Sequence, residues 1–291
     1  MSLNENGSGT ISLAQETKQV LQQHEIRLNR KLGQNYLIDD FKRKKILNFA
    51  SLNSNDVVLE IGPGIGTLTI PMAKQAKKVV GIEQDPRIAR ILKERVEEEG
   101  LANVEVMEAD ALKVDFPYFN KIVSNLPYQI SSPITFKFLE YDFDLAVLMY
   151  QKEFAQRMNA PVGSKHYSRL SVMMHFKAQV KIVDNVSAQS FVPPPKVDSA
   201  VVKMIPLKNI ETDDFFASVC RALFQHRRKK SSKSLRESFH EIGNFKKEEV
   251  KEILGELDSK MENNFLEERV FKLSPEKILE ISTNLKELLN K

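Results

Sequence analysis

The sequence has almost no cysteine and no long apolar run. Its one cysteine, Cys220, has no partner for an internal disulfide, and no cysteine and histidine pair has the spacing of zinc ligands. The clean apolar run at residues 145–149 is far shorter than the roughly 20 residues that cross a bilayer. These absences argue against a disulfide scaffold, a structural metal and a membrane protein.

A secretory signal is also missing at the start of the chain. The first 20 residues lack a basic region followed by an apolar one, so we expect a cytoplasmic protein. Residues 1–12 are small and polar and are predicted to be a disordered tail, followed by a helical stretch over residues 18–31. With 291 residues, 42% of them hydrophobic and 28% charged, the chain has the composition of one large or two modest globular domains.

The net charge of +4 is small, but the basic residues are unevenly distributed. Residues 221–236 hold no acid and seven basic side chains: Arg221, Arg227, Arg228, Lys229, Lys230, Lys233 and Arg236. Such a run is either a solvated surface or, if it lies beside a nucleotide-sized site, a surface that binds phosphates.

Short β-branched runs alternate with helical patterns in the middle of the chain, which predicts an α/β fold with a mostly parallel sheet. The predicted strands are residues 57–61, 79–82, 104–107, 122–123 and 145–149, with further extended regions at 180–186 and 199–205. Only helical patterns follow residue 207. We therefore predict an α/β domain over residues 13–206 and a small all-helical domain over residues 207–291.

The sequence predicts several helix ends. Asp85 and Pro86 begin an amphipathic helix that Gly100 ends. In the helical region, Thr212 is predicted to cap one helix and Ser274 to cap the last.

A glycine-rich turn, residues 60–66, follows the first predicted strand, where open α/β sheets bind ligands. Glu83 ends the next strand 21 residues after Gly62, as a ribose-binding acid would. The spacing G-x-G-x-G differs from the G-x-G-x-x-G of nicotinamide enzymes, and Asp110 can accept from an adenine amino group. This pattern favours S-adenosylmethionine, although a turn needs glycine for ordinary packing and strand-end acids also bind loop amides.

The segment Ser124-Asn125-Leu126-Pro127-Tyr128 ends the fourth strand and resembles the turn of amino-group methyltransferases. The Leu126 carbonyl and the Asn125 side-chain oxygen are two acceptors that can hold one adenine amino group and direct its lone pair at a methyl donor. Tyr128 offers a stacking face for the base. The alternative is an ordinary Asx-Pro turn with a buried tyrosine.

A flipped base needs a second wall. Phe191 precedes a rigid proline run, residues 193–195, and is predicted either to cover the base or to be a core side chain.

Five motifs in order resemble the small-subunit ribosomal RNA adenine dimethyltransferases of the KsgA type. They are QNYL at residues 34–37, EIGPGIG at 60–66, NLPYQISSP at 125–133, GSKHYSRL at 163–170 and FVPPPKVDS at 191–199. The resemblance covers roughly residues 27–240. It implies a Rossmann-like class I methyltransferase sheet, S-adenosylmethionine as the cofactor, no metal, and dimethylation of two adjacent adenosines near the 3′ end of small-subunit rRNA in ribosome biogenesis.

The resemblance also implies site residues, and a monomer that acts on the assembling small subunit. The cofactor residues are Asn35, Leu37, Gly62, Glu83, Asp110 and Asn125. The residues at the target base are Asn125, Leu126, Pro127, Tyr128 and Phe191. The basic residues Arg227, Arg228, Lys229 and Lys230 lie where the family joins its helical domain, which favours RNA binding for them.

Two residues depart from the family, which often has Phe where Tyr36 stands and Asn where Gln129 stands.

Three other functions stay open. The first is a large-subunit rRNA methyltransferase of the macrolide-resistance type, and the second is a non-catalytic nucleic-acid-binding relative. The third, a nicotinamide oxidoreductase, is disfavoured by the glycine spacing.

Overall fold

The computed structural model describes residues 11–26, 35–207 and 212–289. The predicted tail therefore lies outside the described residues except for its last two positions. Ser12 caps the first helix, α1 (Leu13–Gln23), by accepting from the backbone N–H of Gln15. This helix begins before the predicted stretch 18–31, and most of the rest of that stretch lies outside the described residues.

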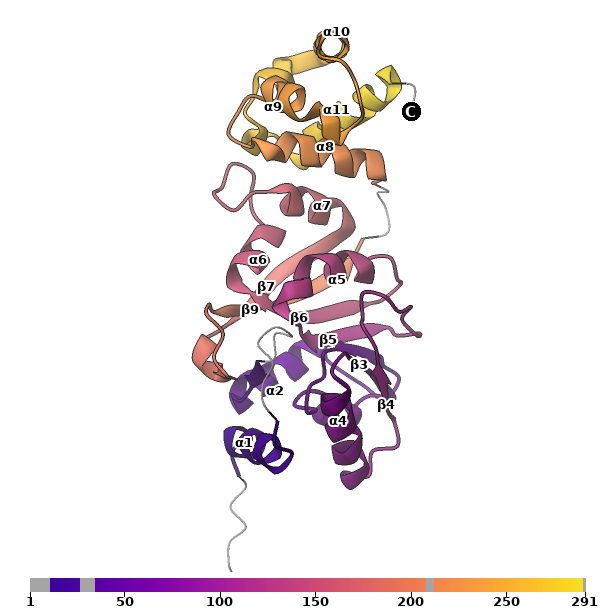
Figure 1. The fold of residues 1–291 in the computed structure, drawn as a ribbon, viewed down its shortest axis with the longest axis vertical. Helices are drawn as coiled ribbons and strands as arrows, with labels where there is room; N and C mark the ends of the chain where they lie inside the picture. The colour runs from indigo at the N-terminus through magenta and orange to yellow at the C-terminus, as the bar shows by residue number, and fades with distance from the viewer. Residues whose placement is uncertain (1–10, 27–34, 208–211, 290–291) are drawn as a thin grey trace, which may run out of the picture. The chain divides into compact units, whose positions relative to one another are not determined.

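A seven-stranded sheet in the order β4-β3-β2-β5-β6-β9-β7 forms the centre of the fold (Figure 1). Its strands are β2 (Val57–Ile61), β3 (Lys78–Glu83), β4 (Val104–Glu108), β5 (Lys121–Asn125), β6 (Leu145–Gln151), β7 (Ala178–Val186) and β9 (Ser199–Pro206). The first five run parallel to one another, and β9 runs antiparallel to β6. The predicted α/β class and every predicted strand are confirmed. The strand order reverses at β2, so the space beyond the ends of β2 and β5 is where such sheets bind ligands.

A second, two-stranded sheet was not predicted. It pairs β1 (Tyr36–Leu37) antiparallel with β8 (Phe191–Val192). Two residues are too short a run to show any periodicity. The pairing places the QNYL and FVPPP motifs side by side although more than 150 residues separate them in the sequence.

The first helices are α1, α2 (Asp40–Ala50), α3 (Thr69–Ala73), α4 (Pro86–Glu98) and α5 (Ser131–Phe138). Residues of α2 and α3 pack against the apolar side chains of β2, β5 and β6 in one buried cluster. A second cluster joins α1 to α4. The predicted start of α4 is confirmed, because the Asp85 carboxylate accepts from the backbone N–H of Arg87 and Pro86 follows it.

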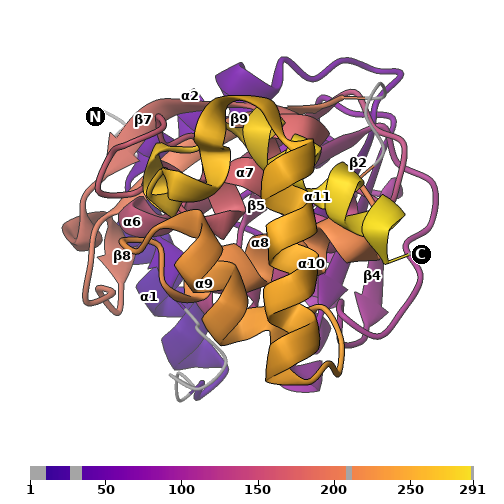
Figure 2. The same ribbon diagram turned by 90° about the horizontal axis from the view of Figure 1, so that it is seen from above.

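The remaining helices are α6 (Lys152–Met158), α7 (Arg169–Lys177), α8 (Asp214–Gln225), α9 (Ser231–Ser238), α10 (Lys247–Lys260) and α11 (Pro275–Leu288). Short 3₁₀ helices are Tyr128–Ile130, Ala188–Ser190, Phe239–Glu241, Glu262–Glu267 and Val270–Lys272. Figure 2 looks onto α8, α9, α10 and α11, which pack together through their apolar faces. Ser274 caps α11, as predicted. The prediction for Thr212 is wrong: Asp213 caps α8, because its carboxylate accepts from the N–H of Phe216 at 2.8 Å.

Contacts within the chain divide it into two compact units. The first comprises Met1–Lys152 and Ile182–Met204, and the second comprises Glu153–Lys181 and Ile205–Lys291. The second unit therefore includes α7 as well as the helices beyond residue 206. Domains at 13–206 and 207–291 remain a prediction.

Candidate active site

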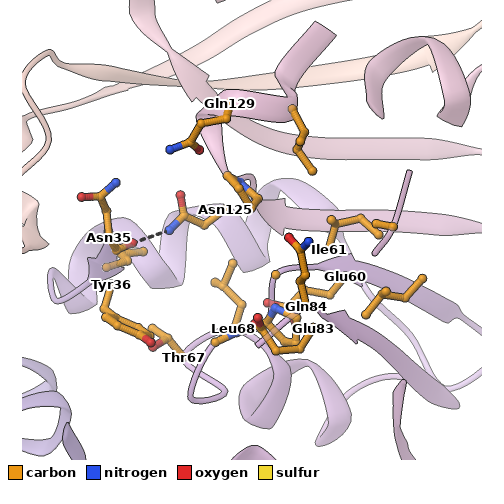
Figure 3. Close-up of a pocket in the computed structure, with 18 of the residues that line it drawn as sticks. Asn35, Tyr36, Glu60, Ile61, Thr67, Leu68, Glu83, Gln84, Asn125 and Gln129 are labelled. Atoms are coloured by element: carbon orange, nitrogen blue, oxygen red, sulfur yellow. Dashed lines mark hydrogen bonds between the residues drawn. The ribbon is translucent and has the colours of Figure 1, made fainter. Parts of the chain in front are cut away.

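A cavity of about 140 Å³ lies at the carboxyl ends of β2, β3 and β5 in the first unit (Figure 3). Asn35, Tyr36 and Gln129 lie toward one side of it, and Glu60, Glu83 and Gln84 lie toward the other. Its lining includes all six residues predicted to bind the cofactor: Asn35, Leu37, Gly62, Glu83, Asp110 and Asn125. The topology of the sheet thus brings together residues that are spread over 91 positions of the sequence.

The glycine-rich turn touches two of the other motifs. Gly62 and Gly64 have φ values of 66° and 58°, which disfavour any residue with a side chain. A Cβ atom on Gly62 would lie 3.2 Å from Cγ of Pro127, and one on Gly64 would lie 2.8 Å from Cε1 of Tyr36. These glycines are therefore required by contact as well as by backbone conformation.

Glu83 is held at the edge of the cavity by the loops beside it. Its Oε2 accepts from the backbone N–H of Gly64 at 3.1 Å, and its Oε1 accepts from that of Asp85 at 3.0 Å. Burial raises the pKa of this carboxyl, which is only 8% exposed. Each oxygen has a second lone pair, so the carboxylate can still accept from hydroxyl groups in the cavity.

Asp110 follows β4 and is arranged in a similar way. Its Oδ1 accepts from the backbone N–H of Leu112 at 3.0 Å, and its Oδ2 lies 3.5 Å from the Lys113 ammonium. Both predicted cofactor acids therefore bind loop amides, the ordinary role of strand-end carboxylates, and also line the cavity.

The side chain of Asn125 has a fixed orientation. Its Nδ2 donates to the backbone carbonyl of Asn35 at 2.9 Å (Figure 3). Because the amide nitrogen is engaged, the Oδ1 atom is the acceptor that remains for a ligand in the cavity. Leu126 is 2% exposed and is not among the residues that line the cavity, whereas Pro127 beside it is. A contact of the Leu126 carbonyl with a target base stays a prediction.

The two predicted stacking residues do not line this cavity. The Tyr128 hydroxyl lies 2.5 Å from Oγ of Ser199, and burial raises the pKa of Tyr128. Phe191 is 1% exposed and packs in the buried cluster that contains Leu37 and Val186. The structure thus places the Phe191 ring in the core, and its contact with a target base remains a prediction.

Sequence reasoning missed Glu60, a cavity residue inside the quoted motif EIGPGIG. Glu60 is 2% exposed, and its Oε2 accepts from the Thr69 hydroxyl at 2.6 Å. Burial raises the pKa of Glu60 to about 8, so this carboxyl is mostly neutral at pH 7. Its position in the sequence could have identified Glu60, because a carboxylate in a strand that runs through the centre of a parallel sheet is buried.

Tyr36 is another missed cavity residue. It is 6% exposed, and its hydroxyl has no hydrogen-bond partner in the described part of the chain. Burial raises the pKa of Tyr36, so the hydroxyl stays protonated and its donor is unused.

The predicted RNA-binding residues lie in the second unit and differ in their partners. Lys229 pairs with Glu237, and Lys230 pairs with Glu267. Arg227 donates to the backbone carbonyl of Tyr167. Two of the four predicted cations are thus already paired with acids.

No group of three or more histidine, cysteine, aspartate or glutamate side chains is placed to hold a metal ion among the described residues. Within the same residues, no helix is long and apolar enough to span a membrane.

The Tyr36 hydroxyl predicts an unusual response to substitution. Because Tyr36→Phe removes a buried donor without a partner, we expect the free energy of unfolding to stay the same or to rise by up to about 1 kcal/mol in urea denaturation. The matched control is Tyr150→Phe, whose hydroxyl lies 2.7 Å from that of Thr135 and whose loss should cost about 1 kcal/mol. Equal losses in both variants would contradict the assignment.

The raised pKa of Glu60 predicts a dependence of stability on pH. The folded protein holds this proton more tightly than the unfolded chain, whose value lies near 4.5, so stability should fall as the pH rises through about 8. Between pH values of about 6 and 9 we expect a loss on the order of 2 kcal/mol from this group. Glu60→Gln should remove that part of the loss in urea denaturation, whereas the exposed Glu98→Gln should not. Parallel pH profiles for the parent and Glu60→Gln would exclude the raised pKa.

Comparisons with known proteins agree on a family. The model of the family "Ribosomal RNA adenine dimethylase" matches residues 25–269. The probable ribosomal RNA small subunit methyltransferase A of Methanothermobacter thermautotrophicus is 57% identical over 273 residues, which cover 94% of this chain and 96% of that protein.

Two solved structures are also similar. The dimethyladenosine transferase from Plasmodium falciparum has a TM-score of 0.74 at 35% identity, covering 86% of this chain and 97% of its own. The 23S rRNA methyltransferase ErmE has a TM-score of 0.63 at 28% identity, covering 87% and 100%. The predicted family, enzyme class and cofactor are confirmed: this chain belongs to the ribosomal RNA adenine dimethylase family of S-adenosylmethionine-dependent methyltransferases.

Proposed function

We propose that this enzyme dimethylates the exocyclic amino groups of two adjacent adenosines near the 3′ end of small-subunit rRNA during ribosome biogenesis. The observation that carries the chemistry is the orientation of Asn125, whose Nδ2 donates to Asn35 and whose Oδ1 remains as an acceptor at the cavity. The choice of the small subunit is supported by the relative from Methanothermobacter thermautotrophicus, which is named for that subunit and shares 57% of its residues.

The cavity fits S-adenosylmethionine. Glu83 has free lone pairs for two ribose hydroxyls, and Asp110 has them for an adenine amino group. Gly62 and Gly64 line the cavity, so the backbone of the turn is what they offer a ligand there. The cofactor supplies an electrophilic methyl group on a sulfonium, and the protein's own residues do the positioning.

The target amino group is held by two acceptors of the chain. We assign these to Oδ1 of Asn125 and the backbone carbonyl of Leu126, each taking one N–H of the adenine amino group. Held in this way, the nitrogen presents its lone pair to the cavity rather than to the ring, which makes it the nucleophile. The nitrogen becomes acidic once it carries positive charge and loses its proton afterwards, so no strong base is required. The acceleration comes from orientation and electrostatics.

Tyr128 is the proposed stacking face for the target base, and Ser199 is its positioning residue through the 2.5 Å contact between their hydroxyls. Phe191 is proposed as the opposite wall. That role requires the ring to leave the cluster it shares with Leu37, so it belongs to the RNA-bound state.

We further propose that the enzyme acts as a monomer in the cytoplasm, on the assembling small subunit. The monomer is supported by the cavity, since all of its lining residues come from the first unit of one chain. The cytoplasmic location follows from the proposed substrate, the assembling small subunit.

The test is transfer of labelled methyl from S-adenosylmethionine to small ribosomal subunits that lack the modification, followed by mass mapping of the product. Large subunits and naked rRNA serve as parallel substrates. Dimethyladenosine at two neighbouring small-subunit positions is the expected product. Label confined to large-subunit RNA would instead assign the resistance type of activity, and RNA binding without any label would assign a non-catalytic function.

Asn125→Ala should separate chemistry from cofactor binding. It removes one acceptor for the amino group, so we expect transfer to be abolished, with a loss of at least about 100-fold, while binding of S-adenosylmethionine stays detectable. Asn125→Asp keeps an acceptor but lacks the N–H that bonds Asn35, and should fall between alanine and the parent. The exposed Asn159→Ala is the control. Undiminished turnover of Asn125→Ala would exclude this mechanism.

Glu83→Gln should act on the cofactor instead. The amide keeps the size of the side chain but replaces one acceptor by a donor that faces the N–H of Gly64 or Asp85. We expect calorimetry to show about tenfold or weaker binding of S-adenosylmethionine. Glu108→Gln, at the exposed end of β4, is the matched control and should bind as the parent does. An unchanged constant for Glu83→Gln would count against the ribose role.

A further inference from the structure

The second unit contains a groove that no part of the proposed mechanism uses. Its volume is about 490 Å³. The cationic side chains that line it are Arg157, Lys165, Arg169, Arg221 and Arg227, and the carboxylate in the lining is that of Glu153. Excess positive charge in a concave surface concentrates anions.

These cations come from segments that are far apart in the sequence. Arg157 lies on α6, Lys165 lies in the loop before α7, and Arg169 is the first residue of α7. Arg221 lies on α8, and Arg227 follows the end of that helix. Arg157, Lys165 and Arg169 therefore stand outside the basic run at residues 221–236, and only the fold brings them beside Arg221 and Arg227.

The loop that carries Lys165 is anchored at both ends. The N–H of Gly163 donates to the carbonyl of Phe271 at 2.8 Å, and the Tyr167 hydroxyl donates to the carbonyl of Leu273 at 2.8 Å. Arg227 in turn donates to the carbonyl of Tyr167. This anchoring accounts for the motif GSKHYSRL, to which the proposed chemistry gives no role, and it means that the groove is preorganised.

Three of the groove cations have no competing partner. Within the described residues, the side chains of Arg157, Lys165 and Arg169 make no ion pair and no hydrogen bond. All three are exposed. Each can bind a phosphate without first breaking an ion pair with a carboxylate.

Arg221 is shared with an acid, since its Nη1 lies 3.3 Å from Oε2 of Glu241. Lys229 and Lys230 outside the groove pair with Glu237 and Glu267. An RNA that used those two lysines would have to break one ion pair for every phosphate that it placed there.

We propose that this groove binds the sugar-phosphate backbone of the substrate RNA, with Arg157, Lys165 and Arg169 as its principal phosphate contacts. The identification of that RNA as small-subunit rRNA rests on the proposed function. The groove contacts are electrostatic and carry no sequence preference, so they position the RNA and leave the choice of base to the first unit.

The experiment neutralises the three free cations together, as Arg157→Gln, Lys165→Gln and Arg169→Gln in one variant. Binding to unmodified small ribosomal subunits is measured by filter retention at several salt concentrations. We expect at least about tenfold weaker binding at fixed salt, and a slope of log K against log salt that is shallower by about 2, because each phosphate contact contributes roughly 0.7–0.9 to that slope. The dissociation constant for S-adenosylmethionine should stay unchanged, which shows that the first unit is intact, and the midpoint of urea denaturation should match that of the parent, which shows that the variant is folded.

The matched control removes the same charge from the same unit at paired lysines that no prediction places at the RNA: Lys260→Gln, Lys277→Gln and Lys286→Gln, whose partners are Glu287, Glu268 and Asp213. Its affinity should lie within about threefold of the parent. A second variant, Arg157→Lys with Arg169→Lys, keeps the charges and should retain most of the binding. Equal effects of the glutamine variant and the control would overturn the groove assignment, as would an unchanged salt slope in the glutamine variant.

Failure of the proposed function gives a different result. The unaltered chain would then show no methyl transfer to small subunits. The groove would be tested by measuring how the glutamine variant, the lysine control and the Arg→Lys variant each bind naked rRNA, relative to the parent. Parent-like binding of that RNA by the glutamine variant would overturn the groove assignment independently.

Discussion

The structure of the site depends on the close approach of the glycine-rich turn to its neighbours. A Cβ atom on Gly62 would lie 3.2 Å from Pro127, and one on Gly64 would lie 2.8 Å from Tyr36, so a side chain at either position would displace its neighbour. The turn after β2 thus packs against the turn after β5, which holds the residue proposed to bind the ribose and the residue proposed to bind the target amino group in one rigid assembly. Positioning catalysis needs that rigidity, because its effect comes from a fixed distance between two reactants.

The same packing sets the electrostatics of the cavity. Glu60 and Glu83 lie on neighbouring strands and are both buried, so burial raises both pKa values, and the charge of Glu83 raises that of Glu60 further. Glu83 has two backbone amides that stabilise its charged form, whereas Glu60 has one hydroxyl. Burial thus raises the pKa of both carboxyls, and Glu60, with a pKa of about 8, is mostly neutral at pH 7.

Much of this arrangement could be predicted from the sequence, because local patterns determine it. The β-branched runs gave the strands, and the acids and glycines at strand ends gave the cavity lining, since parallel strands end at one edge of the sheet. The pairing of β1 with β8 could not be predicted, because it joins two residues to two others across the chain. The contact of Tyr128 with Ser199 and the burial of Phe191 depend on that tertiary arrangement and show no periodicity.

The basic run in the sequence and the unpaired cations in the structure are mostly different residues. A run of lysines and arginines counts cations, but an anion responds to cations that lack a partner and share a concave surface. Lys229 and Lys230 stand in the strongest run, and both are paired with acids that lie distant in the sequence or on the next helix. Arg157 and Arg169 stand in no run, yet α6 and α7 bring them to one groove without a carboxylate attached. The proposed phosphate path therefore follows the unpaired cations of the folded chain, whereas the predicted one follows the density of charge along the sequence.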